Sequence, residues 1–125
     1  MSRPQIKTQA FLASLPLFKE LSPAELDPIA IGTTEMHVPR GEIIFNRGDP
    51  CVGFHLVVYG QVKLAFLTPE GSEKVIEIIG PGGSFGEALM FMEKPYVVMA
   101  QALADTLLLH VSNTVVFDEI ERKPQ

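Results

Sequence analysis

A glycine-rich segment, residues 80–95, contains the residue types whose spacing best suits ligand binding. Its glycines lead into Gly86-Glu87, and the residues that follow can form a short helix. A helix that opens from a glycine-rich loop presents free backbone N–H groups, which suit an anion such as a phosphate. The other interpretation is a surface loop with glycines at tight turns. We call this segment the cassette, and its candidate ligand-contacting residues are Gly83, Phe85, Gly86, Glu87, Ala88 and Leu89.

The other side chains that could bind a metal or act as nucleophiles are isolated in the sequence. The histidines are His37, His55 and His110, and the missing His-x-His pair argues against a jelly-roll metalloenzyme. Cys51 is the one cysteine, which excludes a disulfide framework and any multi-cysteine zinc or iron–sulfur site. No nucleophile–base pair can be inferred, so we expect no enzyme activity.

Composition indicates one ordinary globular domain. The chain has 125 residues, of which 46% are hydrophobic and 20% charged. The net charge of −5 and the scattered basic residues argue against nucleic-acid binding by these residues alone. No run approaches the ~18 apolar residues of a membrane span, and the first residues lack the apolar stretch of a signal peptide. We therefore expect a cytoplasmic protein with no membrane segment.

The elements that must position the cassette are predicted from periodicity. Residues 5–18 predict a short helix that ends near Pro16, within an N-terminal helical region at 1–31. Ser22 as N-cap, Pro23 at the first helical position and Glu25 two residues later form a capping box that starts a second helix. Pro28 is expected to kink or shorten that helix. Residues 113–122 return to helical spacing and predict the start of a C-terminal helix.

Between the helices, at residues 33–112, the apolar pattern has a period of two, and glycines and prolines separate the runs. Val62, Leu64 and Phe66, for example, alternate with other residues and predict one core-facing side. The pattern predicts a mainly β fold, a sandwich or a small barrel. The predicted strands are 33–38, 42–46, 53–59, 61–68, 72–79, 96–103 and 106–112.

Five sequence segments, which together span about residues 15–122, suggest a known family. In order and spacing they resemble the cyclic-nucleotide-binding sensory domain of the catabolite-activator/fumarate–nitrate-reductase (Crp/Fnr) family of bacterial transcription regulators. The resemblance implies an eight-stranded double-sheet jelly roll with short flanking helices. It also implies that homodimer formation and DNA binding need a dimerisation helix and a helix-turn-helix domain, which we expect to be absent from these 125 residues. The segments are Leu17-Phe18-x-x-Leu21-Ser22-Pro23, Gly41-Glu42-x-Ile44-Phe45-x-x-Gly48-Asp49, Phe54-x-Leu56-Val57-x-x-Gly60-x-Val62-Lys63-Leu64, Gly80-Pro81-Gly82-x-x-Phe85-Gly86-Glu87 and Ala102-Leu103-Ala104-Asp105-Thr106-Leu107-Leu108.

The chain departs from this family at the phosphate site. In nucleotide-binding members, the resemblance implies, the Gly86-Glu87 turn holds the cyclic phosphate and the ribose, and an Arg-Ser/Thr-Ala motif about ten residues later neutralises the phosphate. Here the arginine position falls at Tyr96, followed by Val97 and Val98. A loss of ~3 kcal/mol from the missing cation weakens binding more than a hundredfold. We therefore expect no useful binding of cyclic AMP or cyclic GMP, with a weak cyclic-nucleotide binder as an alternative.

Two further segments, 67–74 and 91–102, look most like the dissimilatory nitrate respiration regulator branch of the family. That likeness implies a small-molecule or gas effector, such as nitric oxide sensed through haem, and no iron–sulfur cluster. An effector-free β-roll that binds a partner protein is the alternative. The other interpretation of each histidine is a surface or partly buried strand residue, and that of each methionine is core filling. The candidate haem ligands are His37, His55, His110, Met90, Met92 and Met99.

Overall fold

The computed structural model describes residues 8–122, which begin with two short N-terminal helices. Helix α1 spans Thr8–Ala13, and a 3₁₀ turn, η1, spans Pro16–Phe18. The single helix predicted at 5–18 is therefore divided, and its first three residues lie outside the described range. The division has a local cause, because a residue before proline avoids the helical conformation and Leu15 is extended, with φ −79° and ψ 136°.

Helix α2, Pro23–Ile31, confirms the predicted capping box. The Ser22 hydroxyl accepts a hydrogen bond from the Glu25 N–H, and the Glu25 carboxylate accepts one from the Ser22 N–H at 2.7 Å. The helix continues past Pro28, and the Gly32 N–H donates to the Pro28 carbonyl at 3.1 Å. Pro28 therefore does not end the helix, because the donor that it lacks would have served the exposed first turn, where water can replace it.

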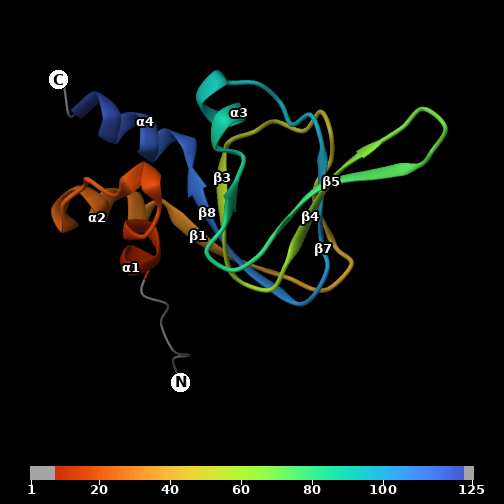
Figure 1. The fold of residues 1–125 in the computed structure, drawn as a ribbon. Helices are drawn as coiled ribbons and strands as arrows, with labels where there is room; N and C mark the ends of the chain where they lie inside the picture. Colours follow the sequence, from red (N-terminus) through yellow and green to blue (C-terminus); the bar gives the residue numbers. More distant parts are fainter. Residues whose placement is uncertain (1–7, 123–125) are drawn as a thin grey trace.

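Eight strands form two antiparallel four-stranded sheets that face each other, with α1, α2 and α4 at one side (Figure 1). One sheet has the order β1-β8-β3-β6 and the other β2-β7-β4-β5. This arrangement confirms the predicted eight-stranded double-sheet jelly roll with flanking helices. The strands are β1 Thr33–Val38, β2 Ile43–Phe45, β3 Gly53–Tyr59, β4 Val62–Leu67, β5 Glu73–Ile79, β6 Ser84–Phe85, β7 Met99–Ala102 and β8 Thr106–Ser112.

All seven strands expected from periodicity are present, and β1, β3 and β8 have the predicted bounds. The eighth, β6, lies inside the cassette and has two residues, too few to show alternation. Strand β7 begins at Met99 instead of Tyr96, because residues 96–98 pass through the bend after Pro95 before pairing starts. Helix α3 spans Glu87–Met92 and α4 spans Asn113–Arg122.

Two apolar clusters stabilise the fold, one on each face of the β1-β8-β3-β6 sheet. Val57 and Leu108 point between the two sheets, into the interior of the roll. Their strand neighbours Leu56 and Leu109 point outward and pack with α1, α2 and α4. Because side chains alternate along β3 and β8, one face of this sheet packs against the helices and the other face lines the interior of the roll.

The β4–β5 hairpin projects from the roll (Figure 1). Phe66 is 42% exposed there, so its predicted place on the core face is wrong. The pairing of β4 with β5 shifts register between Leu64 and Ala65, and β4 pairs with β7 only as far as Ala65. Beyond that point the hairpin has no facing sheet. Within residues 8–122, no helix is both long and apolar enough to span a lipid bilayer.

Candidate functional site

The cassette turn is fixed to the sheet by its backbone. The Gly82 N–H donates to the Val57 carbonyl, and the Val57 N–H donates to the Gly83 carbonyl, both at 2.9 Å. Gly86 then caps α3 with φ +97°, a left-handed conformation that favours glycine. The predicted short helix after the glycines is confirmed, and its start is held in one position against β3.

The cassette side chains point in different directions. Leu89 packs against the interior cluster with the buried Phe85, whereas Ala88 is exposed. The Glu87 carboxylate accepts a hydrogen bond from the Ser84 hydroxyl. It lines a depression of about 450 Å³ with Ser84, Leu15 and Pro16, which places it toward the N-terminal helices.

Tyr96, at the position expected for the arginine, is part of the roll interior. It is 5% exposed, and its ring stacks on Phe45 with centroids 3.5 Å apart and planes within 4°. Its N–H donates to the Asp49 carbonyl at 3.0 Å, and its carbonyl accepts from the Gly48 N–H at 2.8 Å. Burial and contact with Cys51 raise the pKa of the Tyr96 phenol well above its usual value, so the ring stays neutral. Of its neighbours, Val98 is buried and Val97 is 49% exposed.

The lysine nearest in sequence does not reach this interior. Lys94 is exposed and lines a separate depression with Cys51 and Asn113. The Cys51 thiol, which is half-buried, lies 3.3 Å from the Gly53 carbonyl oxygen and 3.6 Å from that of Gly86. A Cys51 packing role therefore agrees with its contacts.

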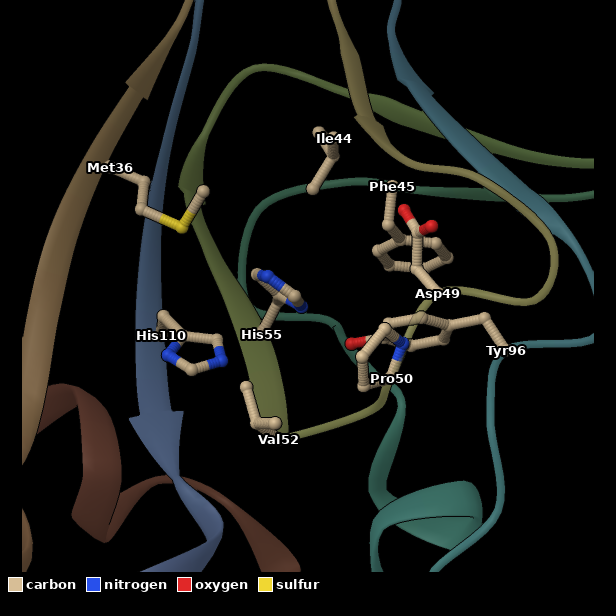
Figure 2. Close-up of a pocket in the computed structure, with 9 residues that line it drawn as sticks. All are labelled: Met36, Ile44, Phe45, Asp49, Pro50, Val52, His55, Tyr96 and His110. Carbon is tan, nitrogen blue, oxygen red and sulfur yellow. The ribbon is translucent and has the colours of Figure 1, made fainter.

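Tyr96 lines a cavity of about 350 Å³ that also contains two of the three histidines (Figure 2). Among residues 8–122, no lysine or arginine lines it. Its walls are mostly apolar, and the polar groups are two imidazoles, a phenol and one carboxylate. The lining residues are Met36, Ile44, Phe45, Asp49, Pro50, Val52, His55, Tyr96 and His110.

His55 and His110 are neighbours across the β3–β8 pairing. They are register partners, and their ring centroids lie 4.9 Å apart. Burial, with a smaller contribution from His110, lowers the pKa of His55 to about 3, and burial also lowers the pKa of His110. Both imidazoles are therefore neutral at pH 7. The Nδ1 of His55 is buried without a hydrogen-bond partner, which costs about 1–3 kcal/mol if nothing binds it.

The remaining candidate ligands lie elsewhere. The His37 Nε2 is 2.6 Å from the Tyr59 hydroxyl, at a separate depression near Asp105. Met92 is 55% exposed, Met90 is buried in the outer cluster with the helices, and Met99 is buried on β7. Over the described range, no group of three His, Cys, Asp or Glu side chains could hold a metal. His55 and His110 alone among these candidates share the Tyr96 cavity.

Sequence reasoning missed most of the cavity wall, including Phe45, Met36 and Asp49. One signal was available for the histidines. Period-two alternation places His55 on the same face as Val57, and His110 on the same face as Leu108, so both point inward. Their meeting depends on the register of β3 with β8, which alternation does not specify.

Comparison with known proteins identifies similar domains. A family model described as "Cyclic nucleotide-binding domain" matches residues 35–123. The Cyclic AMP receptor protein of Thermus thermophilus is 36% identical over 95 residues, covering 75% of this chain and 44% of that protein. The CRP-like cAMP-activated global transcriptional regulator of Mycobacterium tuberculosis is 24% identical over 114 residues, covering 91% of this chain and 51% of that protein. The chain thus spans about half the length of these two relatives.

A solved structure of similar size also matches. The sensor domain of the transcriptional regulator DNR from Pseudomonas aeruginosa superposes with a TM-score of 0.85 at 34% identity. The match covers 90% of this chain and 76% of that one. The similarity to this branch, expected from two short segments, therefore extends over the described fold.

Proposed function

Because the chain belongs to the cyclic nucleotide-binding domain family and is a sensory domain of the Crp/Fnr type, we propose that it senses an effector other than a cyclic nucleotide. It acts without catalysis, in a cytoplasmic bacterial transcription regulator. Binding of DNA and of a second subunit belongs to other segments of that regulator. Two of the relatives are named for cyclic AMP, so the identity of the effector is the part of the proposal that most needs an experiment.

The observation that carries the proposal is the Tyr96–Phe45 stack. A cyclic phosphate bound at the cassette needs a cation that offsets the loss of its hydration. Tyr96 offers a neutral ring that is already in contact with Phe45 at a centroid distance of 3.5 Å. A charge-assisted hydrogen bond contributes about 1.5–3 kcal/mol, so its loss weakens binding roughly 10- to 150-fold. Glu87, bonded to Ser84 and directed toward the N-terminal helices, adds no positive charge.

The cavity indicates the kind of effector that replaces the nucleotide. Its volume of about 350 Å³ is at the lower end of the ~300–1,000 Å³ range of ligand pockets. Neutral imidazoles from His55 and His110 and mostly apolar walls favour a small uncharged molecule over an anion.

Haem-based sensing of nitric oxide or another diatomic gas is a second candidate. A neutral imidazole is a common axial ligand of haem iron, and the unpartnered Nδ1 of His55 favours such a role. His55 is 4% exposed, however, so a macrocycle reaches it only if the roll opens. Haem reconstitution followed by an absorbance scan tests this candidate. A Soret band that disappears in His55→Phe supports it, and no Soret band in the unaltered chain rejects it.

The experiment that tests the main proposal restores the missing cation. Tyr96→Arg combined with Val97→Ser is expected to gain binding of a fluorescent cyclic AMP analogue, measured by anisotropy, relative to the unaltered chain. Val97→Ser alone is the matched control and should gain nothing, because Val97 is 49% exposed and carries no charge. A correctly folded double variant that still does not bind means that the cassette has diverged beyond these two side chains.

A thermal-shift panel of cyclic nucleotides, run beside the haem scan, separates the remaining alternatives. Stabilisation by a nucleotide at millimolar concentration alone identifies the weak binder. No stabilisation and no Soret band leave two candidates, a small uncharged effector of another kind and the effector-free β-roll that binds a partner protein.

A further inference from the structure

The cavity wall brings together three uncharged side chains with donor atoms suited to a soft metal ion. His55 and His110 contribute imidazoles, and Met36 contributes a thioether (Figure 2). Met36 pairs with Leu108 across β1 and β8, and His110 is two residues further along the same face of β8. Side chains on such diagonal positions remain within reach of one another when they are long. All three residues therefore face the same space from three adjacent strands.

The two rings have a separation suited to binding one ion. A metal–nitrogen bond of about 2.0 Å places each ring centroid about 3.2 Å from the ion. Two such centroids are then about 4.5 Å apart at a right angle and about 5.5 Å apart at a trigonal angle. The observed separation is 4.9 Å, with the ring planes inclined by 57°.

The surroundings of the pair also require an explanation. His55 is 4% exposed, and its Nδ1 has no hydrogen-bond partner. A buried polar atom without a partner in a native structure needs an explanation, and an ion that binds there is one. Gly53 lies close to the backbone of β8 as well as to the second ring, because a Cβ at that position would lie 2.2 Å from the Val111 carbonyl oxygen and 2.7 Å from the His110 Nε2.

We propose that His55, His110 and Met36 form a binding site for a monovalent copper ion. Imidazole suits several metals, but a thioether favours Cu(I). The ligands are neutral and the walls mostly apolar, and the cost of burying an ion rises with the square of its charge. A monovalent ion therefore loses less hydration free energy than Zn²⁺ on entering this cavity. The nearby carboxylate, Asp49, already accepts a hydrogen bond from the Asn46 N–H at 2.9 Å.

This site lies in the cavity that the proposed effector would occupy and uses the histidine proposed for haem, so copper would compete with both. Its test measures copper binding itself, without an effector or haem. The tag-free chain is titrated with Cu(I) under anaerobic conditions in competition with bicinchoninate, whose copper complex is coloured. One equivalent of Cu(I) should transfer to the protein. His55→Phe and His110→Asn should each weaken binding at least about 100-fold, and Met36→Leu about 10-fold.

His37→Ala is the matched control, because His37 contacts Tyr59 outside the cavity, and it should bind Cu(I) as the unaltered chain does. Circular dichroism establishes which variants fold. If His55→Phe does not fold, His110→Asn and Met36→Leu together still test the site. X-ray absorption at the copper edge should show imidazole nitrogen together with sulfur. No transfer of copper, unchanged affinity in His110→Asn, an equal loss in His37→Ala, or an absorption spectrum without sulfur overturns the proposal.

Discussion

Truncating Tyr96 to alanine tests whether its ring fills the core where a nucleotide binder places its cation. The side chain is 5% exposed and stacks on Phe45. Removing roughly 150 Å² of buried apolar surface at about 25 cal/mol per Å² costs about 4 kcal/mol. This agrees with the ~3–5 kcal/mol measured for truncations of buried aromatic residues. For a chain of this length, the melting temperature should fall by roughly 10–25 °C.

Urea unfolding followed by circular dichroism measures this loss, with two matched variants. Tyr96→Phe keeps the stack and loses only the hydroxyl and its contact with Cys51, so it should cost no more than about 1 kcal/mol. Val97→Ala, at the exposed neighbouring position, should change stability by less than about 0.5 kcal/mol. If Tyr96→Ala costs no more than Val97→Ala, the ring does not fill the core and the reasoning about the cassette is wrong.

Three further predictions concern stability. Burial lowers the pKa of His55 from 6.5 to about 3. Between these two pH values the unfolded chain binds a proton at His55 and the folded chain does not. The free energy of unfolding is therefore unaffected by this group above pH 6.5 and falls as the pH is lowered toward 3. The loss between pH 7 and 4.5 should be about 2–3 kcal/mol, and His55→Phe should flatten the profile measured by urea unfolding. Ser22→Ala removes the N-cap acceptor of α2 and should cost about 1 kcal/mol in the same assay. Gly86→Ala forces a side chain into φ +97° and should lower the free energy of unfolding by about 1–2 kcal/mol.

Each of these has its own control. The pH prediction is contradicted if His55→Phe, once folded, keeps the full slope, because other titrating groups then cause it. For Ser22, a glycine at the cap should recover most of the loss, since glycine is tolerated at this position. For Gly86, the matched change is Gly80→Ala, where an added Cβ meets no atom within 4 Å and φ is not left-handed. Equal losses in the two glycine variants contradict the strain argument.

Local features of the fold could be predicted from the sequence because their causes are local. The capping box at Ser22 and the bounds of β3 follow from neighbouring residues. Strand β6 could not be predicted, since its two residues form a strand only by pairing with His55 and Leu56. The prediction that Phe66 lies in the core was wrong, because alternation predicts the face on which a side chain lies but not whether a second sheet covers that face.

The candidate site was predictable only in part for the same reason. The sequence shows that no lysine or arginine lies between Pro95 and Glu121, and the structure adds that Tyr96 fills the expected cation position by stacking on Phe45, a residue 51 positions earlier. The direction of Glu87 depends on its bond to Ser84, and the pairing of His55 with His110 depends on strand register. The bond of Glu87 to Ser84 is local but depends on the geometry of the cassette turn. The aromatic stack and the histidine pairing are non-local contacts, which arise from tertiary packing that periodicity does not encode.

We propose above that this member of the cyclic nucleotide-binding domain family does not use a cyclic nucleotide as its effector. Isothermal titration calorimetry of the unaltered chain with cyclic AMP, and then with cyclic GMP, tests it most directly. We expect no saturable heat at micromolar nucleotide, because the buried ring of Tyr96 lies at the position where a cation is expected. A one-to-one isotherm with a micromolar dissociation constant for either nucleotide would contradict it.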